Sequence, residues 1–228
     1  MNETHPISIA IDGPSGAGKS TLARRLASTL HFLYVDTGAI YRTIAYYAYA
    51  NHLDPADQGA VLAALPEIRI QLHHDAQGLQ RMLLNGEDVT DAIRLPQISQ
   101  YASVVSAYPG VRAFLLEMQR DFARKGSVIM DGRDIGTVVL PRADVKIFLT
   151  ASPEARARRR CLELEQRGTP EPFDQVLAEI QQRDWDDSHR ETAPLRQAED
   201  AVVVDTTELN FEESLAALLA VVRGKAAL

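Results

Sequence analysis

One short segment constrains the fold of this chain more than any other. Residues 13–21, Gly-Pro-Ser-Gly-Ala-Gly-Lys-Ser-Thr, fit the pattern G-x-x-x-x-G-K-[ST], in which glycines let successive backbone N–H groups point at one anion. The apolar run 7–11 before it predicts a strand, and residues 19–30 after it predict a helix whose positive end faces the same anion. Strand, loop and helix in this order predict an α/β fold that binds a nucleoside triphosphate.

Two side chains of this loop have separate expected roles. Lys19 can reach the β- and γ-phosphates, and the Ser20 hydroxyl is placed to ligate Mg²⁺. The alternative is a glycine-rich turn that binds nothing, and it is disfavoured because every fixed position is filled and both flanks are correct. The loop residues that we expect at the triphosphate are Gly13, Pro14, Ser15, Gly16, Ala17, Gly18, Lys19, Ser20 and Thr21.

Apolar runs alternate with helical patterns along the rest of the chain, which is typical of a parallel sheet with crossover helices. At 228 residues the chain fits one α/β domain. We therefore expect a five-stranded parallel sheet flanked by helices. The expected strands are 7–11, 32–35, 128–130, 145–149 and 201–204, and the expected helices are 19–30, 38–51, 91–107, 109–125, 153–167, 173–187 and 210–223.

Two regions interrupt the alternation. Residues 67–89 contain period-two segments and end near Asn85-Gly86, a strong hairpin signal, so they predict a small antiparallel insert. Residues 153–190 read as two charged helices joined by a Gly/Pro-containing stretch at 167–172, which we interpret as a mobile helical lid. A plain solvated helical hairpin would have the same sequence pattern.

Composition limits the classes of partner that the chain can bind and the cell compartment that we expect. The net charge of −7 argues against nucleic acid as the main partner, and the chain has no apolar run long enough to cross a membrane. The single cysteine, Cys161, excludes an internal disulfide, and residues 1–6 are short and polar rather than a signal peptide. We therefore expect a cytoplasmic protein without a membrane partner. We also expect a monomer, although composition does not determine the oligomeric state.

The ends of two further predicted strands carry charged residues. Ligands of a parallel sheet lie at the carboxyl ends of its strands, where the phosphate loop also opens. Asp36 and Arg42 follow one strand, and Asp131, Arg133 and Asp134 follow another. The position of Asp131 is typical of an acid that orients Mg²⁺ and its waters, and the two arginines can hold a second anion. The alternatives are that Asp36 only caps the next helix and that Asp131 only begins a turn.

Other sequence features separate the classes of triphosphate-binding protein. The chain has no N-K-x-D segment for reading guanine, which excludes a typical GTPase. A motor or regulatory ATPase needs an output domain, for which 228 residues leave no room. A small kinase remains.

At this point the chain resembles the bacterial cytidylate kinases, nucleoside monophosphate kinases of the P-loop class, over nearly its whole length. No functional position departs from the family pattern, and an antiparallel insert such as 67–89 is characteristic of the bacterial members. The resemblance implies transfer of the γ-phosphoryl group of ATP to CMP or dCMP with Mg²⁺, in pyrimidine nucleotide metabolism. The segments that carry it are 11–21, 36–42, 131–139, 145–151, Arg183-Asp184, Arg190 and 193–195.

The family implies a role for each matching residue. The insert 67–89 would lie on the side that binds the nucleoside monophosphate, with Lys19, Arg133 and Arg183 as catalytic residues. The residues implied at ATP, besides the loop, are Arg156, Arg159 and Arg160. Those implied at the metal are Ser20 and, through water, Asp131. Those implied at the acceptor nucleotide are Thr37, Arg42, Ser103, Arg112, Arg133, Asp134, Arg183, Asp187 and Arg190.

Two rival functions stay open from sequence alone. One is a small kinase with another acceptor, which a panel of acceptors in an ADP-release assay would separate. The other is a nucleotide-sensing module without turnover, which Lys19, Ser20 and Asp131 disfavour and which the absence of ADP formation would favour.

Overall fold

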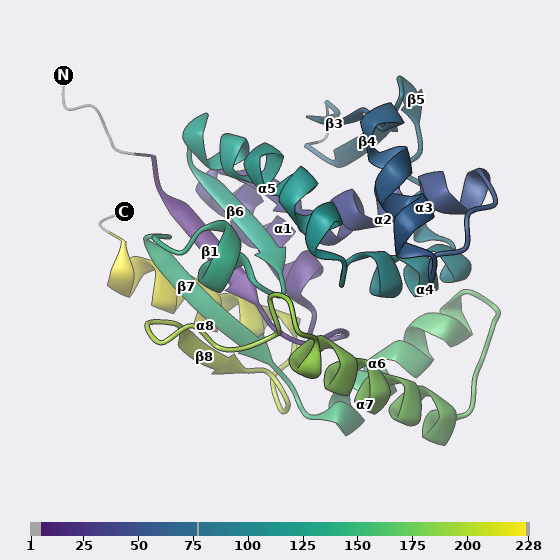
Figure 1. Ribbon diagram of the computed structural model, residues 1–228. Coiled ribbons are helices and arrows are strands. Elements are labelled where there is room, and N and C mark those ends of the chain that lie inside the picture. Colours follow the sequence, from purple (N-terminus) through teal and green to yellow (C-terminus); the bar gives the residue numbers. More distant parts are fainter. Residues whose placement is uncertain (1–5, 77, 227–228) are drawn as a thin grey trace. The chain divides into compact units, whose positions relative to one another are not determined.

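The computed structural model describes residues 6–76 and 78–226, and its contacts divide the chain into two compact units (Figure 1). The first unit is Met1–Tyr34 with Gly126–Leu228, and the second is Val35–Lys125. The chain therefore leaves the first unit after one strand–helix–strand segment and returns to it at Gly126.

The five-stranded sheet predicted from the sequence is confirmed, with the order β2-β6-β1-β7-β8. β1 pairs in parallel with β6 and with β7, and β7 pairs in parallel with β8. β1 lies at the centre, so the loop that follows it opens from the middle of the carboxyl edge. The strands are β1 Ser8–Asp12, β2 Leu33–Asp36, β6 Val128–Gly132, β7 Val145–Thr150 and β8 Val202–Asp205.

The core of the first unit forms where two helices pack on this sheet. Ile9 and Ile11 of β1 are fully buried and lie in one cluster with Leu26 of α1 and Leu218 of α8. Asn210 and Glu213 form a capping box at the start of α8, which satisfies backbone N–H groups that a helix end leaves unpaired. The helices of this unit are α1 Lys19–Leu30, α6 Pro153–Gln166, α7 Phe173–His189 and α8 Phe211–Lys225.

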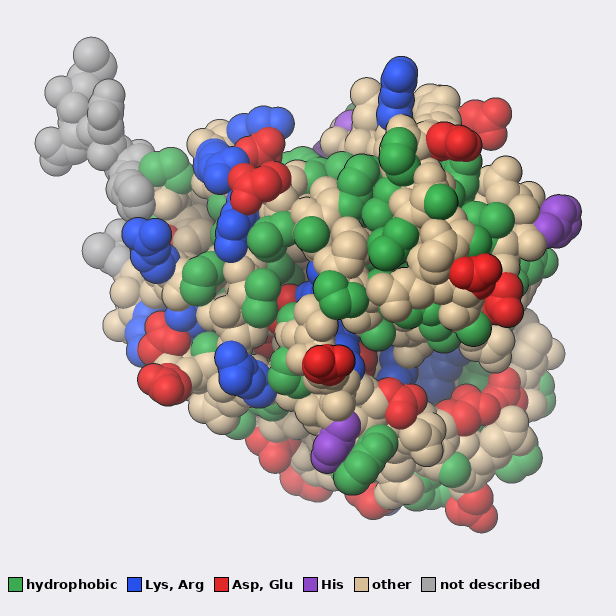
Figure 2. Space-filling view, viewed as in Figure 1, with side chains coloured by type: hydrophobic (Ala, Val, Ile, Leu, Met, Phe, Trp, Pro, Cys, Tyr) green, Lys and Arg blue, Asp and Glu red, His purple; other side chains and the backbone are tan. Residues whose placement is uncertain are grey.

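The helical hairpin predicted at 153–190 is present as α6 and α7. Ala157 and Leu164 of α6 pack against Val176 and Ile180 of α7, so the two helices share a small apolar cluster of their own. Figure 2 shows Asp and Glu side chains over the part of the surface where these helices lie. The hairpin thus buries one narrow stripe and exposes a strongly polar surface.

The second unit combines four helices with the predicted antiparallel insert. Strand β4 pairs with β3 and with β5, and Asn85, with φ 52°, occupies the turn between β4 and β5. Its helices are α2 Thr37–Ala50, α3 Gln58–Ala64, α4 Pro96–Val105 and α5 Pro109–Arg124, with short 3₁₀ turns at Leu65–Glu67 and Ala92–Arg94. Its strands are β3 Ile70–His74, β4 Gln80–Leu84 and β5 Glu87–Asp88.

Three elements differ from the sequence prediction. The single helix predicted at 91–107 is wrong: a 3₁₀ turn ends before Leu95, whose ψ of 143° is the extended conformation that a following proline favours, and α4 then begins at Pro96. The helix at Gln58–Ala64 was not predicted, nor was the π-helical turn at Ile135–Val139 that follows β6.

Candidate active site

The phosphate loop has the backbone geometry that its sequence predicts. A Cβ atom on Gly13 would lie 1.9 Å from the Leu149 carbonyl oxygen, so only glycine fits where the loop leaves β1. Gly16 and Gly18 have φ angles of 75° and 84°, in the left-handed region, and α1 begins directly after Gly18. The loop is therefore folded as an anion cradle at the N-terminus of α1.

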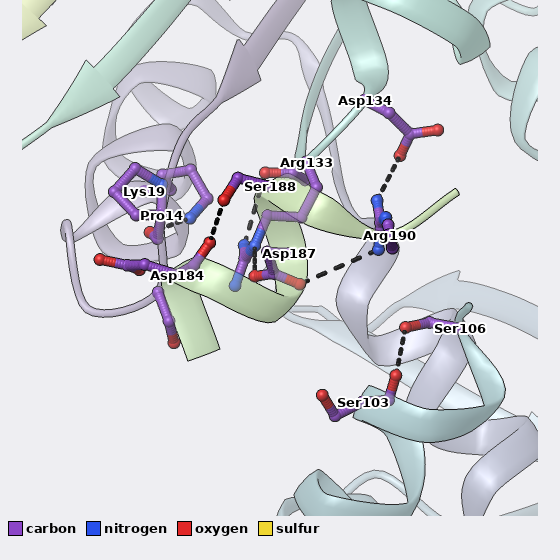
Figure 3. Close-up of polar contacts among 12 residues, drawn as sticks. Pro14, Lys19, Ser103, Ser106, Arg133, Asp134, Asp184, Asp187, Ser188 and Arg190 are labelled. Atoms are coloured by element: carbon purple, nitrogen blue, oxygen red, sulfur yellow. Dashed lines mark hydrogen bonds and ion pairs between the residues drawn. The ribbon is translucent and has the colours of Figure 1, made fainter. Parts of the chain in front are cut away.

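Lys19 is buried within this loop. Its ammonium group donates to the Pro14 carbonyl oxygen at 2.7 Å (Figure 3). Burial, and next the positive charges of Arg133 and Arg183, hold the pKa of Lys19 well below its ordinary value, although Asp131 and Asp187 act in the opposite direction. Positive charge that is this poorly compensated favours an anionic ligand.

Asp131 lies at the centre of the predicted metal site. It belongs to β6, and one of its carboxylate oxygens accepts a hydrogen bond from the Ser20 hydroxyl at 2.8 Å while the other accepts from the Tyr34 hydroxyl at 2.9 Å. The strand predicted at 128–130 extends to Gly132, so Asp131 lies within β6 near its carboxyl end and does not start a plain turn. A hydroxyl and a carboxylate are the hard oxygen donors that Mg²⁺ prefers beside phosphates and waters, so the pair fits this ion.

A chain of charged residues continues from β6 to α7. The Arg133 Nε donates to Asp187 at 2.7 Å, and the Arg190 guanidinium lies 3.9 Å from Asp187 and 4.0 Å from Asp134 (Figure 3). Burial alone would raise the pKa of Asp187, but Arg133 and two further arginines outweigh it and lower the pKa. The structure thus brings together four of the residues that the family implies at the acceptor.

Arg156 and Arg159 of α6 make defined contacts that the sequence did not predict. The Arg156 guanidinium is buried, donates to the Ser15 and Ala151 carbonyl oxygens, and forms a two-pronged ion pair with Asp184 of α7. Arg159 donates to the carbonyl oxygen and the hydroxyl of Thr206, in the loop after β8. Arg156 therefore already contacts the phosphate loop through the backbone.

The two other arginines predicted to act from this hairpin, Arg160 and Arg183, are more exposed than Arg156. The Arg160 side chain is 41% exposed and pairs with Glu163 on its own helix. Arg183 is half-buried on α7, and its charge acts on both Lys19 and Asp187. Their expected contacts with ATP and with the acceptor remain predictions.

In the second unit, two predicted acceptor residues lie at the start of α2. Asp36 caps this helix by accepting from the Ala39 N–H at 2.9 Å, as the alternative interpretation proposed, and it also pairs with Arg42 at 2.9 Å. The Nε atom of Arg42 is buried and has no hydrogen-bond partner among the described residues, which suits an anion site. Thr37 is the buried first residue of the same helix.

The other two predicted residues of this unit lie on α4 and α5. The Arg112 guanidinium is buried, stacks over the Tyr41 ring with 5.3 Å to its centroid, and donates to the Ser106 carbonyl oxygen at 3.0 Å. The Ser103 carbonyl oxygen accepts from the Ser106 hydroxyl (Figure 3). Ser106 therefore connects the backbone of α4 with the guanidinium of α5.

Comparison with known proteins identifies the family. The family model described as cytidylate kinase matches residues 9–224. The chain belongs to the cytidylate kinase family. A cytidylate kinase of Carboxydothermus hydrogenoformans is 50% identical over 217 residues, covering 95% of this chain and 97% of that protein, and one of Geobacillus kaustophilus is 50% identical, covering 95% and 96%. The crystal structure of an uncharacterized protein from Eubacterium ventriosum has the same fold, with a TM-score of 0.51, 10% identity, and coverage of 94% of this chain and 96% of that one.

Three polar residues of this cytidylate kinase site were not assigned a role from the sequence. Asp12 is buried at the end of β1, Tyr34 contacts Asp131, and Asp184 holds Arg156. Asp12 could have been predicted as a site residue, because it is a carboxylate at the carboxyl end of a strand, where ligands of a parallel sheet bind. The contacts of Tyr34 and Asp184 could not be predicted without knowing which strands and helices are neighbours.

Residues 6–76 and 78–226 lack two further features, a cluster of metal-binding side chains and a membrane-spanning helix. No group of three or more His, Cys, Asp and Glu side chains in these residues is arranged to hold a metal ion. Within the same residues, no helix combines the length and the apolar character needed to cross a membrane.

Proposed function

We propose that this chain transfers the γ-phosphoryl group of ATP to CMP or dCMP, giving ADP and CDP or dCDP. The observation that carries the proposal is the cytidylate kinase match over residues 9–224, in a chain whose phosphate loop is intact. Binding of Mg²⁺ with ATP, action as a monomer in the cytoplasm, and a place in pyrimidine nucleotide metabolism form part of the same proposal.

The chemistry requires alignment more than proton transfer. The acceptor is a phosphate monoester with a second pKa of about 6, so it is largely dianionic at neutral pH and needs no general base. The protein must align the attacking oxygen with the γ-phosphorus and neutralise the charge of the transferring group. Mg²⁺, held beside Ser20 and Asp131, would supply part of that neutralisation.

Three cationic side chains would supply the rest. Lys19 would exchange its bond to the Pro14 carbonyl for the β- and γ-phosphates, which restores the environment that favours its charged form. Arg133 and Arg183 would contact the transferring group when the lid of α6 and α7 closes and excludes water. Arg156, Arg159 and Arg160 are the further residues proposed for ATP.

The remaining proposed residues bind the acceptor. In the second unit Arg42 would hold the acceptor phosphate, with Thr37 near the ribose and with Ser103 and Arg112 at the base. In the first unit Asp187 would contact the ribose. All of these residues are buried or half-buried. Those of the second unit carry donors that suit phosphate and base oxygens, and the Asp187 carboxylate can accept from ribose hydroxyls.

Base choice would rest on charge and hydrogen-bond direction. Cytosine presents an amino donor beside two acceptors, which a carboxylate and a guanidinium match. Asp134 and Arg190 lie close together in the first unit. Uracil would place a carbonyl oxygen against the carboxylate, so the same residues would reject UMP.

A coupled ADP-release assay with CMP, dCMP, UMP and AMP tests the proposal. The proposal predicts the highest kcat/KM for CMP or dCMP. Turnover with another acceptor and not with CMP would favour a different small kinase. Tight ATP binding without ADP formation on any acceptor would favour a nucleotide-sensing module.

A further inference from the structure

Asp12 makes two short bonds to the backbone of another segment. It is the last residue of β1, directly before the phosphate loop, and it is 5% exposed. Its two carboxylate oxygens accept from the backbone N–H groups of Ile135 and Gly136, each at 2.7 Å. One side chain thus satisfies two donors at the start of the π-helical turn Ile135–Val139.

The two bonds lie directly next to the charged residues Arg133 and Asp134 in the chain. The parallel pairing of β1 with β6 ends at the pair Asp12 and Gly132. Arg133 and Asp134 come next, followed at once by the two amides that Asp12 binds. Asp12 therefore holds the C-terminal side of the segment that carries Arg133 and Asp134, while the strand pairing holds its N-terminal side.

The neighbouring residues are arranged for this close approach. A Cβ atom on Gly136 would lie 3.3 Å from the Asp12 Oδ2 atom and 3.2 Å from the Lys146 Cδ atom, both tighter than ordinary contacts. Lys146 is itself held by the Pro141 carbonyl oxygen and Asp200, so it cannot easily move aside. A larger residue at 136 would push the turn away from Asp12.

We propose that Asp12 is a positioning residue that fixes the Arg133–Asp134 segment relative to the phosphate loop and so sets the geometry of acceptor binding. The part that concerns the acceptor rests on the proposed function. The phosphate loop has its own supports, among them the Lys19 bond to Pro14 and the Arg156 bond to Ser15. Loss of the Asp12 carboxylate therefore affects the acceptor more than ATP.

The test is Asp12→Asn, which keeps the size of the side chain but turns an amide N–H₂ group toward one of the two backbone donors. Val222→Ala is the matched control, because Val222 is fully buried in α8 and its truncation weakens the core without removing an acceptor of the Ile135 and Gly136 amides. Three quantities are measured for each protein: hydrogen exchange of the amides in 132–139, kcat/KM for CMP, and the Kd of ATP without acceptor.

For Asp12→Asn we expect exchange of the Ile135 and Gly136 amides to rise about tenfold or more and kcat/KM for CMP to fall about tenfold or more. One of the two bonds is lost, and the other is no longer assisted by charge. We expect the Kd of ATP to change less than about twofold in Asp12→Asn. Val222→Ala should lower the melting temperature while leaving the exchange of 132–139, kcat/KM for CMP and the Kd of ATP near wild type.

Two results would overturn the inference. In one, Asp12→Asn keeps the wild-type exchange rates or the wild-type kcat/KM for CMP. In the other, the Kd of ATP rises as much as kcat/KM falls, which would assign Asp12 to the phosphate loop. A wild-type protein that makes no ADP with CMP would contradict the proposed function alone, and the exchange rates would still decide whether Asp12 holds the turn.

Discussion

The ion pair of Arg156 with Asp184 joins α6 to α7, and Arg156 also donates to Ser15 of the phosphate loop. Removing the Arg156 guanidinium should therefore lower the free energy of unfolding and weaken ATP binding. The Arg156 side chain is 3% exposed and that of Asp184 is 27% exposed. Arg156→Met keeps the aliphatic length but removes the donors to Ser15, Ala151 and Asp184. The perturbation therefore leaves two backbone acceptors and one half-buried carboxylate without the guanidinium.

The expected loss of unfolding free energy follows from the exposed fractions of these two side chains. Removing one partner of a buried pair costs about 3–5 kcal/mol, and the partial hydration of Asp184 sets the expected loss for Arg156→Met near the lower end, about 3 kcal/mol. For a chain of this size that corresponds to a fall in Tm of about 6–12 °C. Asp184→Asn should cost less, about 1–2 kcal/mol, because the backbone bonds of Arg156 survive.

A double-mutant cycle by urea unfolding measures the interaction. The two single variants and the double variant should give a coupling energy of about 1–2 kcal/mol, and ATP should bind more weakly to Arg156→Met because Ser15 loses its donor. Arg160→Met on the same helix is the control, since its exposed pair with Glu163 should contribute under about 0.5 kcal/mol. A coupling energy within about 0.3 kcal/mol of zero would refute the reasoning.

Three further predictions concern the phosphate loop, the base and pH. Lys19→Ala should lower kcat about 10²–10³-fold with a normal melting curve, and wild-type kcat would contradict its role. Asp134→Asn should reduce the ratio of kcat/KM for CMP over UMP by about tenfold, because a mispaired buried donor costs about 1–3 kcal/mol, whereas equal losses on both substrates would exclude base reading. Burial, opposed by the Ile135 and Gly136 amides and by Lys19 and reinforced by Asp134, raises the pKa of Asp12 from 3.8 to about 6. The folded state then binds this proton more tightly than the unfolded state, so from pH 4 to pH 7 wild type should lose about 1–3 kcal/mol of unfolding free energy relative to Asp12→Asn, and parallel pH curves would contradict this.

The parts of the fold that the sequence predicted are those with a local cause. The phosphate loop, the central strands and the hairpin at Asn85 each have a pattern within about ten residues, and each is present. The break at Pro96 also had a local cause, the conformation that proline imposes on Leu95, but the helix predicted at 91–107 did not take it into account.

The parts that could not be predicted depend on neighbours distant in the sequence. Tyr34 reaches Asp131 only because β2 lies beside β6, and no local pattern gives that strand order. The role of Arg156 at ATP, implied by its family position, stays a prediction, whereas its contacts with Ser15 and Asp184, which are 141 and 28 residues away, had no signal in the sequence. The types of residue in the site were therefore predictable, whereas their partners were not.

The central claim is that this chain phosphorylates CMP and dCMP with ATP, and initial rates of ADP release over CMP, dCMP, UMP and AMP test it most directly. We expect kcat/KM to be highest for CMP or dCMP, at least about tenfold above UMP, because the base contacts proposed for Asp134 and Arg190 would match cytosine and oppose uracil. A chain that releases ADP fastest with AMP or UMP, or that releases none with CMP, would contradict the account.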